Sequence, residues 1–220
     1  FAINQTLDDI LLAPIAETYV GVVPEWGRER VNSVLNNFGE PLNFVNSVMQ
    51  LEMERAVTSM LRFVFNSTIG LGGLFDVAGE LGLPIADEDF GQTLASWGFG
   101  EGPYIVLPLF GPSNPRDAIG RGVDYFLDPF SRAIRAHERN QRFLARALDQ
   151  RSMYTNELET LKSTSIDFYA AMRALYRQYR ENDIRNGDMG PEIRIPSITN
   201  EDFEDESFHQ AAAKDGMEHE

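Results

Sequence analysis

The chain has 220 residues, 43% of them hydrophobic, no cysteine and a formal net charge of −15. This length suits one large domain or two small ones, and the apolar content is sufficient for a sizeable core. The negative charge argues against a nucleic-acid-binding protein, which needs clustered positive charge. The lack of cysteine excludes disulfides, thiolate metal ligands and a cysteine nucleophile within these residues.

The acidic excess is concentrated at the C-terminal end of the chain. Residues 188–220 contain ten acidic and two basic residues, against 24 acidic and 17 basic residues in 1–187. Because this segment is also poor in aromatic residues, we expect a disordered tail after one helical domain at 1–187. No signal peptide or transmembrane span is recognisable, and because the chain opens at Phe1 rather than Met we expect further sequence upstream.

The first third of the chain has apolar residues at helical spacing. Pro24 suits the first turn of a helix that Gly39 ends, and Pro41 opens another helix directly after it. A third helix is predicted over residues 53–67, and its apolar residues cover more of its circumference than those of a surface helix usually do. We therefore expect this third helix to be central or to face lipid.

Two turn-rich segments follow. Residues 70–79 contain four glycines, but no Gly-Lys-Ser/Thr follows them, so they do not match a phosphate-binding loop. Close helix packing, or approach of the backbone to a ligand, is the better interpretation. Asp87, Glu88 and Asp89 precede a predicted helix, whose N-terminal end favours carboxylates. A calcium site is the alternative, but the ligand spacing it requires does not follow.

Residues 98–111 form the most apolar run in the chain, with glycines at both ends. The run is too short to span a bilayer as a helix, which needs about 20 apolar residues. Pro103 and Pro108 also oppose one straight helix, and the alternation of a half-buried strand is missing. Two alternatives remain: a buried connector between helices, or a segment that dips into a membrane from one side.

The C-terminal half of the domain predicts further helices. Asn114 followed by Pro115 is a strong helix start, and Asp128 followed by Pro129 repeats the pattern. The helix after Asp128 is expected to be the longest, and a last helix is expected over residues 165–186. Because no strand pattern and no internal repeat is evident, the expected fold is all-α.

One face of the long helix carries five arginines at spacings of three and four residues: Arg132, Arg135, Arg139, Arg142 and Arg146. The simple interpretation is a solvated face. The alternative is a surface that meets phosphate groups or an acidic partner, for which the planar guanidinium is suited. The opposite face is apolar and also carries His137 and Gln141. His137 is interpreted as a core histidine, with a polar position on the wall of a wet channel as the alternative.

No catalytic motif is found. The chain has no serine in a Gly-x-Ser-x-Gly turn and no His-Glu-x-x-His sequence. His209 and His219 lie in the acidic tail, which leaves His137 as the candidate histidine base. The residues therefore favour a non-enzymatic protein without a metal or other cofactor. The alternative is a membrane-surface lipid hydrolase that uses His137 with a nearby acid.

Four stretches in this order resemble a known protein family. The first two are NNFGEPLNFVN at 36–46 and RFVFNSTIGLGGLFDVA at 62–78. The third is DFGQTL at 89–94 with the WG, GPY and LP that follow, and the fourth is GPS with the RD at 116–117. Together they resemble the MlaA family, also called VacJ, of outer-membrane lipoproteins. The resemblance covers about residues 1–187.

This resemblance implies both a fold and a function. The fold is a ring of amphipathic and apolar helices that lies in the inner leaflet of the outer membrane around a central pore. Through the pore, mislocalised phospholipid leaves the outer leaflet and passes to a soluble periplasmic carrier like MlaC, and family members associate with trimeric porins. The resemblance also implies lipid attachment through a cysteine upstream of Phe1. A non-transporting adaptor that only holds porin or carrier is a further alternative.

Within this frame, four groups of residues are expected to serve transport. The lipid path or membrane insertion is assigned to Phe99, Tyr104, Ile105, Val106, Leu107, Leu109 and Phe110. The hinge or gating positions are Asn36, Asn37, Phe38 and Gly39, at the junction of two predicted helices, together with Gly98, Gly100, Gly102 and Pro103. Headgroup or partner contacts are assigned to the five arginines. His137 and Gln141 are the candidate polar positions on the pore wall.

Overall fold

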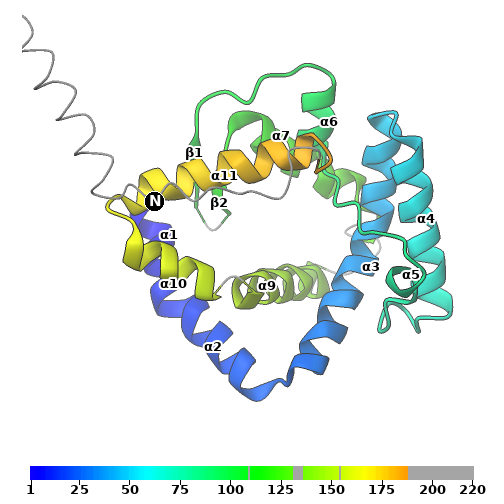
Figure 1. The fold of residues 1–220 in the computed structure, drawn as a ribbon, viewed down its shortest axis with the longest axis horizontal. Helices are drawn as coiled ribbons and strands as arrows, with labels where there is room; N and C mark the ends of the chain where they lie inside the picture. The colour runs from blue at the N-terminus through cyan, green and yellow to red at the C-terminus, as the bar shows by residue number, and fades with distance from the viewer. Residues whose placement is uncertain (109, 131–135, 154, 188–220) are drawn as a thin grey trace, which may run out of the picture.

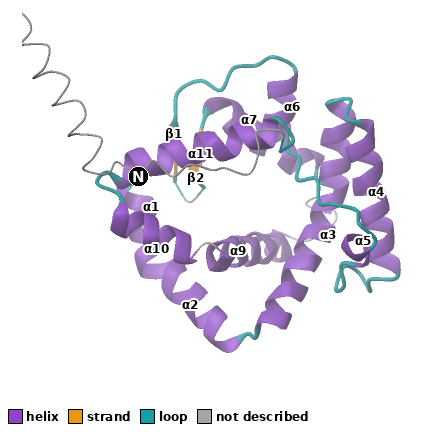
Figure 2. Ribbon diagram, in the orientation of Figure 1, coloured by secondary structure: helices purple, strands orange, loops and turns teal. Residues whose placement is uncertain are grey.

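The computed structural model describes residues 1–108, 110–130, 136–153 and 155–187, and the predicted tail at 188–220 lies outside them. The first half contains α1 (Ala2–Leu7), a π-helical segment η1 (Asp8–Leu12), α2 (Ala13–Val22), α3 (Glu25–Met49), α4 (Met53–Thr68) and α5 (Val77–Glu80). The second half contains α6 (Phe90–Ser96), β1 (Ile105–Leu107), β2 (Gly111–Ser113), α7 (Pro115–Leu127), α9 (Ala136–Met153), α10 (Thr155–Thr164) and α11 (Phe168–Ile184). Figure 2 shows how far helices dominate these ranges.

The helices follow one another around a ring (Figure 1). α2 and α3 form one corner, α6, α7 and α11 form the opposite side, and α9 packs against α2 and α3. The N-terminus meets the start of α11, because the ring of Phe1 contacts the rings of Phe168 and Tyr169. Nearby, Asp8 accepts hydrogen bonds from Arg151 at 2.8 and 3.3 Å. The expected all-α, ring-like fold is confirmed.

The predicted break between two helices at Gly39 and Pro41 is wrong, because α3 continues through both residues. Pro41 removes one helical hydrogen bond and crowds the preceding turn. Packing along α4 offsets this cost, since α3 buries Asn37 and Glu40 there on either side of Gly39. Tertiary contacts therefore hold the helix through a sequence that locally favours a stop. Asn36, Asn37, Phe38 and Gly39 lie inside α3 and not at a helix junction.

The central apolar segment contains a hairpin that the sequence did not predict. β1 and β2 pair in antiparallel register, with Val106 opposite Pro112 and Leu107 opposite Gly111. Gly111 has a φ of +74°, which suits the turn between the strands because glycine lacks a Cβ. Each strand has three residues, too few to display an alternating pattern. Membrane insertion of this segment stays a prediction.

The predicted helix starts are confirmed where local chemistry decides them. The Asn114 side chain accepts a hydrogen bond from the backbone N–H of Asp117 at 2.8 Å, and Pro115 occupies the first turn of α7. Asp89 caps α6 in a reciprocal arrangement with Gln92. The interpretation of residues 70–79 as a close-packing segment is also supported. A Cβ on Gly73 would lie 2.5 Å from the Cβ of Asn37.

Candidate functional site

α4 places its apolar side chains outward and its polar side chains inward. Val57 and Met60 are 56% and 55% exposed, whereas Ser59 and Arg62 are 0% and 1% exposed. Outside this helix, the apolar side chains that are fully buried in the described chain are small, apart from Leu35 and Leu161. The usual distribution of a soluble protein, with large apolar side chains inside, is therefore reversed here. Of the two expectations for this helix, the structure excludes the central position.

The buried face of α4 holds an ion-pair cluster with α3. Arg62 donates from Nε to the Glu40 carboxylate at 2.6 Å and from Nη2 to Asp76 at 2.9 Å. Its Nη1 donates to the Leu83 carbonyl at 2.5 Å. Burial raises the pKa of Glu40, and the hydrogen bond and charge of Arg62 only partly oppose that rise. The cluster joins α3, α4 and the segments on both sides of α5 without a large apolar core.

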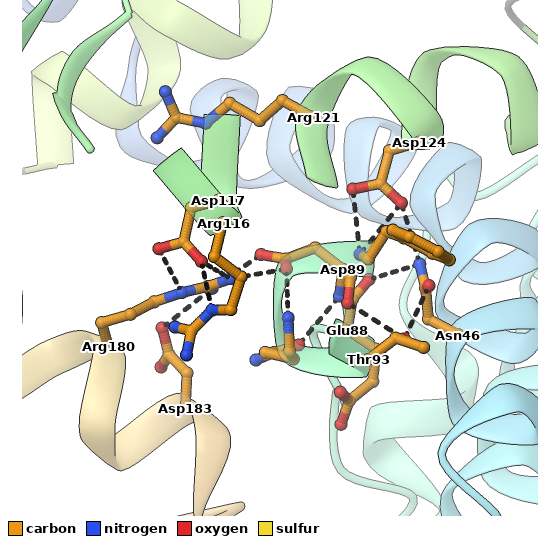
Figure 3. Close-up of polar contacts among 12 residues, drawn as sticks. Asn46, Glu88, Asp89, Thr93, Arg116, Asp117, Arg121, Asp124, Arg180 and Asp183 are labelled. Atoms are coloured by element: carbon orange, nitrogen blue, oxygen red, sulfur yellow. Dashed lines mark hydrogen bonds and ion pairs between the residues drawn. The ribbon is translucent and has the colours of Figure 1, made fainter. Parts of the chain in front are cut away.

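A second buried cluster joins α3, α6 and α7 around Asp124 (Figure 3). The Asp124 carboxylate accepts hydrogen bonds from the Asn46 amide at 3.0 Å and from the backbone N–H of Phe90 at 3.1 Å. Thr93 donates to the Asn46 side-chain oxygen at 3.0 Å. Burial raises the pKa of Asp124 to about 6, although these two donors favour the charged form. The fold therefore holds the pKa of Asp124 well above that of an ordinary aspartate.

A third cluster, at the junction of α6, α7 and α11, is centred on Arg180 (Figure 3). Its guanidinium donates two hydrogen bonds to Asp89, at 2.6 and 2.7 Å, and one to Asp117 at 3.0 Å. The Tyr176 hydroxyl donates to Asp117 as well. Burial alone would raise the pKa of Asp117, but Arg180 and Tyr176 together lower it below its ordinary value. Arg180 thus joins α11 to the N-terminal ends of α6 and α7.

This third cluster borders a pocket of about 200 Å³. The pocket is lined by polar and aromatic side chains from α7, α11 and the N-cap of α6: Asp89, Asp117, Arg121, Tyr176, Tyr179, Arg180 and Asp183. It carries both signs of charge and can therefore hold a small polar group. No set of side chains with metal-ligand geometry occurs among the residues that the structure describes.

The predicted lipid-path residues divide between half-buried and exposed positions. Tyr104 is half-buried, with its ring centroid 5.6 Å from that of Tyr169 and 5.8 Å from that of Tyr176. Phe99 and Phe110 are exposed, and the Phe110 ring lies 5.6 Å from that of Phe143. The β1 residues Ile105, Val106 and Leu107 are half-buried, and Leu109 lies outside the described residues. These residues share one segment, but their role in lipid passage stays a prediction.

The predicted hinge at the start of this segment has the backbone of a turn. Gly98 and Gly102 have φ values of +89° and +74°, which L-residues with a Cβ rarely adopt. Gly100 and Pro103 lie in the same extended loop between α6 and β1. This loop therefore depends on glycine at two positions, and its role as a hinge stays a prediction.

The two arginines of the predicted stripe whose side chains are described contact α3. Arg142 donates to Asp128 at 2.9 Å and to the Phe38 carbonyl at 3.4 Å, and Arg146 donates to the Leu35 carbonyl at 3.4 Å. Leu144, which lies on the apolar face opposite the arginines, is exposed. This part of α9 therefore packs through its arginines, which reverses the expected orientation. Arg132, Arg135, Arg139, His137 and Gln141 fall outside the described side chains, and the contact of the stripe with headgroups or a partner stays a prediction.

Sequence reasoning missed the three buried clusters, because no local motif marks them. Their members are far apart in the chain; Arg62 and Glu40 are 22 residues apart, and Arg180 and Asp89 are 91 residues apart. One signal was available in α3. Asn37, Glu40, Asn43 and Asn46 recur every three residues, and all four are buried. A polar stripe opposite apolar residues on one helix predicts an inward-facing polar surface only if the apolar side is known to be outside.

Comparison with known proteins assigns the chain to a family. The family model described as MlaA lipoprotein matches residues 1–183. The chain belongs to the MlaA family. A Rickettsia bellii relative is 36% identical over 186 residues, which is 84% of this chain and 73% of that protein. The Haemophilus influenzae "Intermembrane phospholipid transport system lipoprotein MlaA" is 30% identical over 185 residues, covering 81% of this chain and 74% of its own length.

A solved MlaA-like structure shares the architecture. It belongs to the study "Structural basis for maintenance of bacterial outer membrane lipid asymmetry" and superposes with a TM-score of 0.74. The two chains are 27% identical, and the match covers 83% of this chain and 96% of the other. The predicted family resemblance is therefore confirmed.

Proposed function

We propose that this chain is an outer-membrane component of a phospholipid transport system that maintains the lipid asymmetry of that membrane. The observation that carries the proposal is the reversed polarity of the fold, with large apolar side chains exposed and charged side chains buried. The family, the name of the Haemophilus relative and the subject of the solved structure support the same role.

The exposed apolar surface supports embedding in one leaflet. Soluble monomers rarely expose contiguous apolar patches larger than a few hundred Å², because each Å² left in water forgoes roughly 25 cal/mol. The α2–α3 corner exposes Val22 and Trp26, and α4 exposes Val57 and Met60. None of the described helices combines the length and apolar content that crossing a bilayer requires. A ring that enters only one leaflet would cover the exposed apolar side chains and would need no membrane-spanning helix.

The finer parts of the proposal rest on the family resemblance. We place the ring in the inner leaflet of the outer membrane, with phospholipid passing through its centre to a soluble periplasmic carrier and with a trimeric porin beside it. Attachment through a cysteine upstream of Phe1 belongs to the same proposal. In this arrangement the protein moves intact phospholipid and performs no covalent chemistry.

A vesicle assay tests this function. Donor vesicles that contain the protein and a fluorescent phospholipid are mixed with acceptor vesicles, with and without the soluble carrier of a related system. We expect the protein to increase transfer several-fold over protein-free vesicles when the carrier is present, and mass spectrometry to find the lipid intact. Transfer equal to that of protein-free vesicles would contradict the proposal. Steady accumulation of lysophospholipid would instead support a hydrolase.

A further inference from the structure

The pocket between α6, α7 and α11 contains a charge of each sign that the fold leaves incompletely paired. Asp89, Asp117 and Asp183 line it together with Arg121 and Arg180. Arg180 already satisfies two of the three carboxylates, since it donates to both oxygens of Asp89 and contacts both oxygens of Asp117. Arg121 and Asp183 remain as the groups open to a ligand.

The Asp183 carboxylate is poorly compensated. It lies 4.0 Å from Nη1 of Arg180, at the outer limit of an ion pair, and it is 45% exposed. Within the described part of the chain, this carboxylate accepts no hydrogen bond. A second cation that reached it would gain a charge-assisted hydrogen bond without displacing an existing one.

Arg121 offers the opposite charge on α7. Its Nη2 donates to the Pro112 carbonyl at 3.3 Å, and in the ranges that the structure describes it forms no ion pair. In Figure 3 its guanidinium points away from the Arg180 cluster. Within the described residues no hydrogen bond joins it to Asp117 or Asp183, and one of its five N–H donors is used by Pro112. A planar guanidinium with free donors is suited to phosphate oxygens.

We propose that this pocket binds the zwitterionic phosphoethanolamine group of a phospholipid, with Arg121 on the phosphate and Asp183 on the primary ammonium. The lipid source rests on the proposed transport function. The pocket volume of about 200 Å³ accommodates a small polar group, since one water in the liquid occupies about 30 Å³. Tyr125, which lies one turn after Arg121 on the same face of α7, is exposed and offers apolar surface to an acyl chain.

The charges of Arg121 and Asp183 favour one class of lipid headgroup over the others. An anionic headgroup without an amine would place its charge among three carboxylates with no cation to answer Asp183. A choline headgroup carries the positive charge but has no N–H to donate to the carboxylate. An ethanolamine headgroup satisfies both groups, because its ammonium has three donors and its phosphate has acceptor oxygens.

Isothermal titration calorimetry of the purified protein in detergent micelles tests this inference by measuring the dissociation constants of four probes. These are the dihexanoyl forms of phosphatidylethanolamine, phosphatidylcholine and phosphatidylglycerol, and soluble phosphoethanolamine. We expect the ethanolamine lipid to bind at least about tenfold more tightly than the other two lipids, as loss of one charge-assisted hydrogen bond predicts. It should also bind more tightly than phosphoethanolamine. Equal binding of the soluble probe would overturn the lipid source.

Two variants with matched controls locate the site. Asp183→Asn should weaken binding of the ethanolamine lipid roughly tenfold and should strengthen binding of phosphatidylglycerol, from which it removes a like charge, whereas Arg121→Gln should weaken both. Glu181→Gln and Arg177→Gln remove the same charges from exposed positions of α11 that do not line the pocket, and should bind like the wild type. Wild-type binding by both pocket variants would overturn the proposal. If the wild type transfers phospholipid between vesicles yet shows no headgroup preference, the inference fails and the transport function stands.

Discussion

At the scale of single residues, the fold depends on charges that water does not reach. Arg62 and Glu40 have side chains that are 2% and 0% exposed, and the arginine also reaches Asp76. A buried pair of this kind adds little over a well-packed apolar pair, but removing one partner leaves an uncompensated buried charge. Such clusters therefore make the fold sensitive to single substitutions that remove a charge.

Arg62→Met is expected to lower the free energy of unfolding by roughly 3–5 kcal/mol, because Glu40 would remain buried without its partner. The double variant Arg62→Met with Glu40→Gln should recover most of this loss. Arg185→Met, which breaks an ion pair between two exposed side chains, should cost less than about 1 kcal/mol. Thermal unfolding in detergent measures all three. Equal losses for Arg62→Met and Arg185→Met would refute the structural role of the cluster.

Asp124 should make stability depend on pH. Its pKa rises from 3.8 in the unfolded chain to about 6 in the fold. Between these values the folded chain retains a proton that the unfolded chain has lost, so the free energy of unfolding falls as pH rises. The loss amounts to roughly 3 kcal/mol and is complete about one pH unit above the folded pKa.

Asp124→Asn removes this titration and keeps an oxygen to accept from the N–H of Phe90. We expect the variant to match the wild type near pH 4 and to exceed it by up to roughly 3 kcal/mol at pH 7.5. Denaturant unfolding in detergent at the two pH values provides the measurement. A wild type and variant that lose stability in parallel between them would show that Asp124 does not titrate in this range.

At the scale of elements, local chemistry was predictable and long-range pairing was not. Asn114 and Asp89 cap α7 and α6 as their neighbours in the sequence predict. The continuity of α3 was missed because the sequence places Gly39 and Pro41 together, whereas the contacts that hold them in a helix come from α4. The hairpin was missed because its strands are too short for a pattern. Helix capping is decided within four residues, and these other features are decided between elements.

Gly39 and Gly73 give a direct test of this view. A Cβ on Gly39 would meet only Nη1 of Arg146, at 3.6 Å, so Gly39→Ala should raise the free energy of unfolding by roughly 0.5–1 kcal/mol through helix propensity. Gly73 has a φ of +94° and lies against Asn37, so Gly73→Ala should lower it by roughly 1–3 kcal/mol.

Thermal unfolding ranks the two variants, and the vesicle transfer assay shows whether Gly39 acts in gating. If Gly39 is an ordinary helix position, Gly39→Ala should transfer phospholipid at the wild-type rate. A variant that is no more stable than the wild type and transfers lipid more slowly would restore Gly39 as a hinge.

At the scale of the whole molecule, the family resemblance predicted the ring, and no pattern within one helix could have done so. Apolar periodicity reports which side chains share a face, but it does not say whether that face meets protein or lipid. On α4 the apolar face is exposed and the polar face is buried. Whether the apolar face is buried or exposed can be inferred only when the neighbours of the helix are known.

The exposed apolar face of α4 yields a prediction for the intact protein. Val57 and Met60 are exposed on α4, so Val57→Asp with Met60→Asp removes little buried surface and should leave the helical fold in detergent intact by circular dichroism. In a bilayer the same charges would each cost about 2.5–3.5 kcal/mol at depth. We therefore expect the double variant to bind phospholipid vesicles at least about 100-fold more weakly in a flotation assay, since tenfold corresponds to about 1.4 kcal/mol. Aspartates at the exposed polar positions Ser163 and Thr164 of α10 serve as the charge-matched control and should float with the vesicles like the wild type. A folded Val57→Asp, Met60→Asp variant that floats equally well would mean that a protein partner, and not lipid, covers the apolar face of α4.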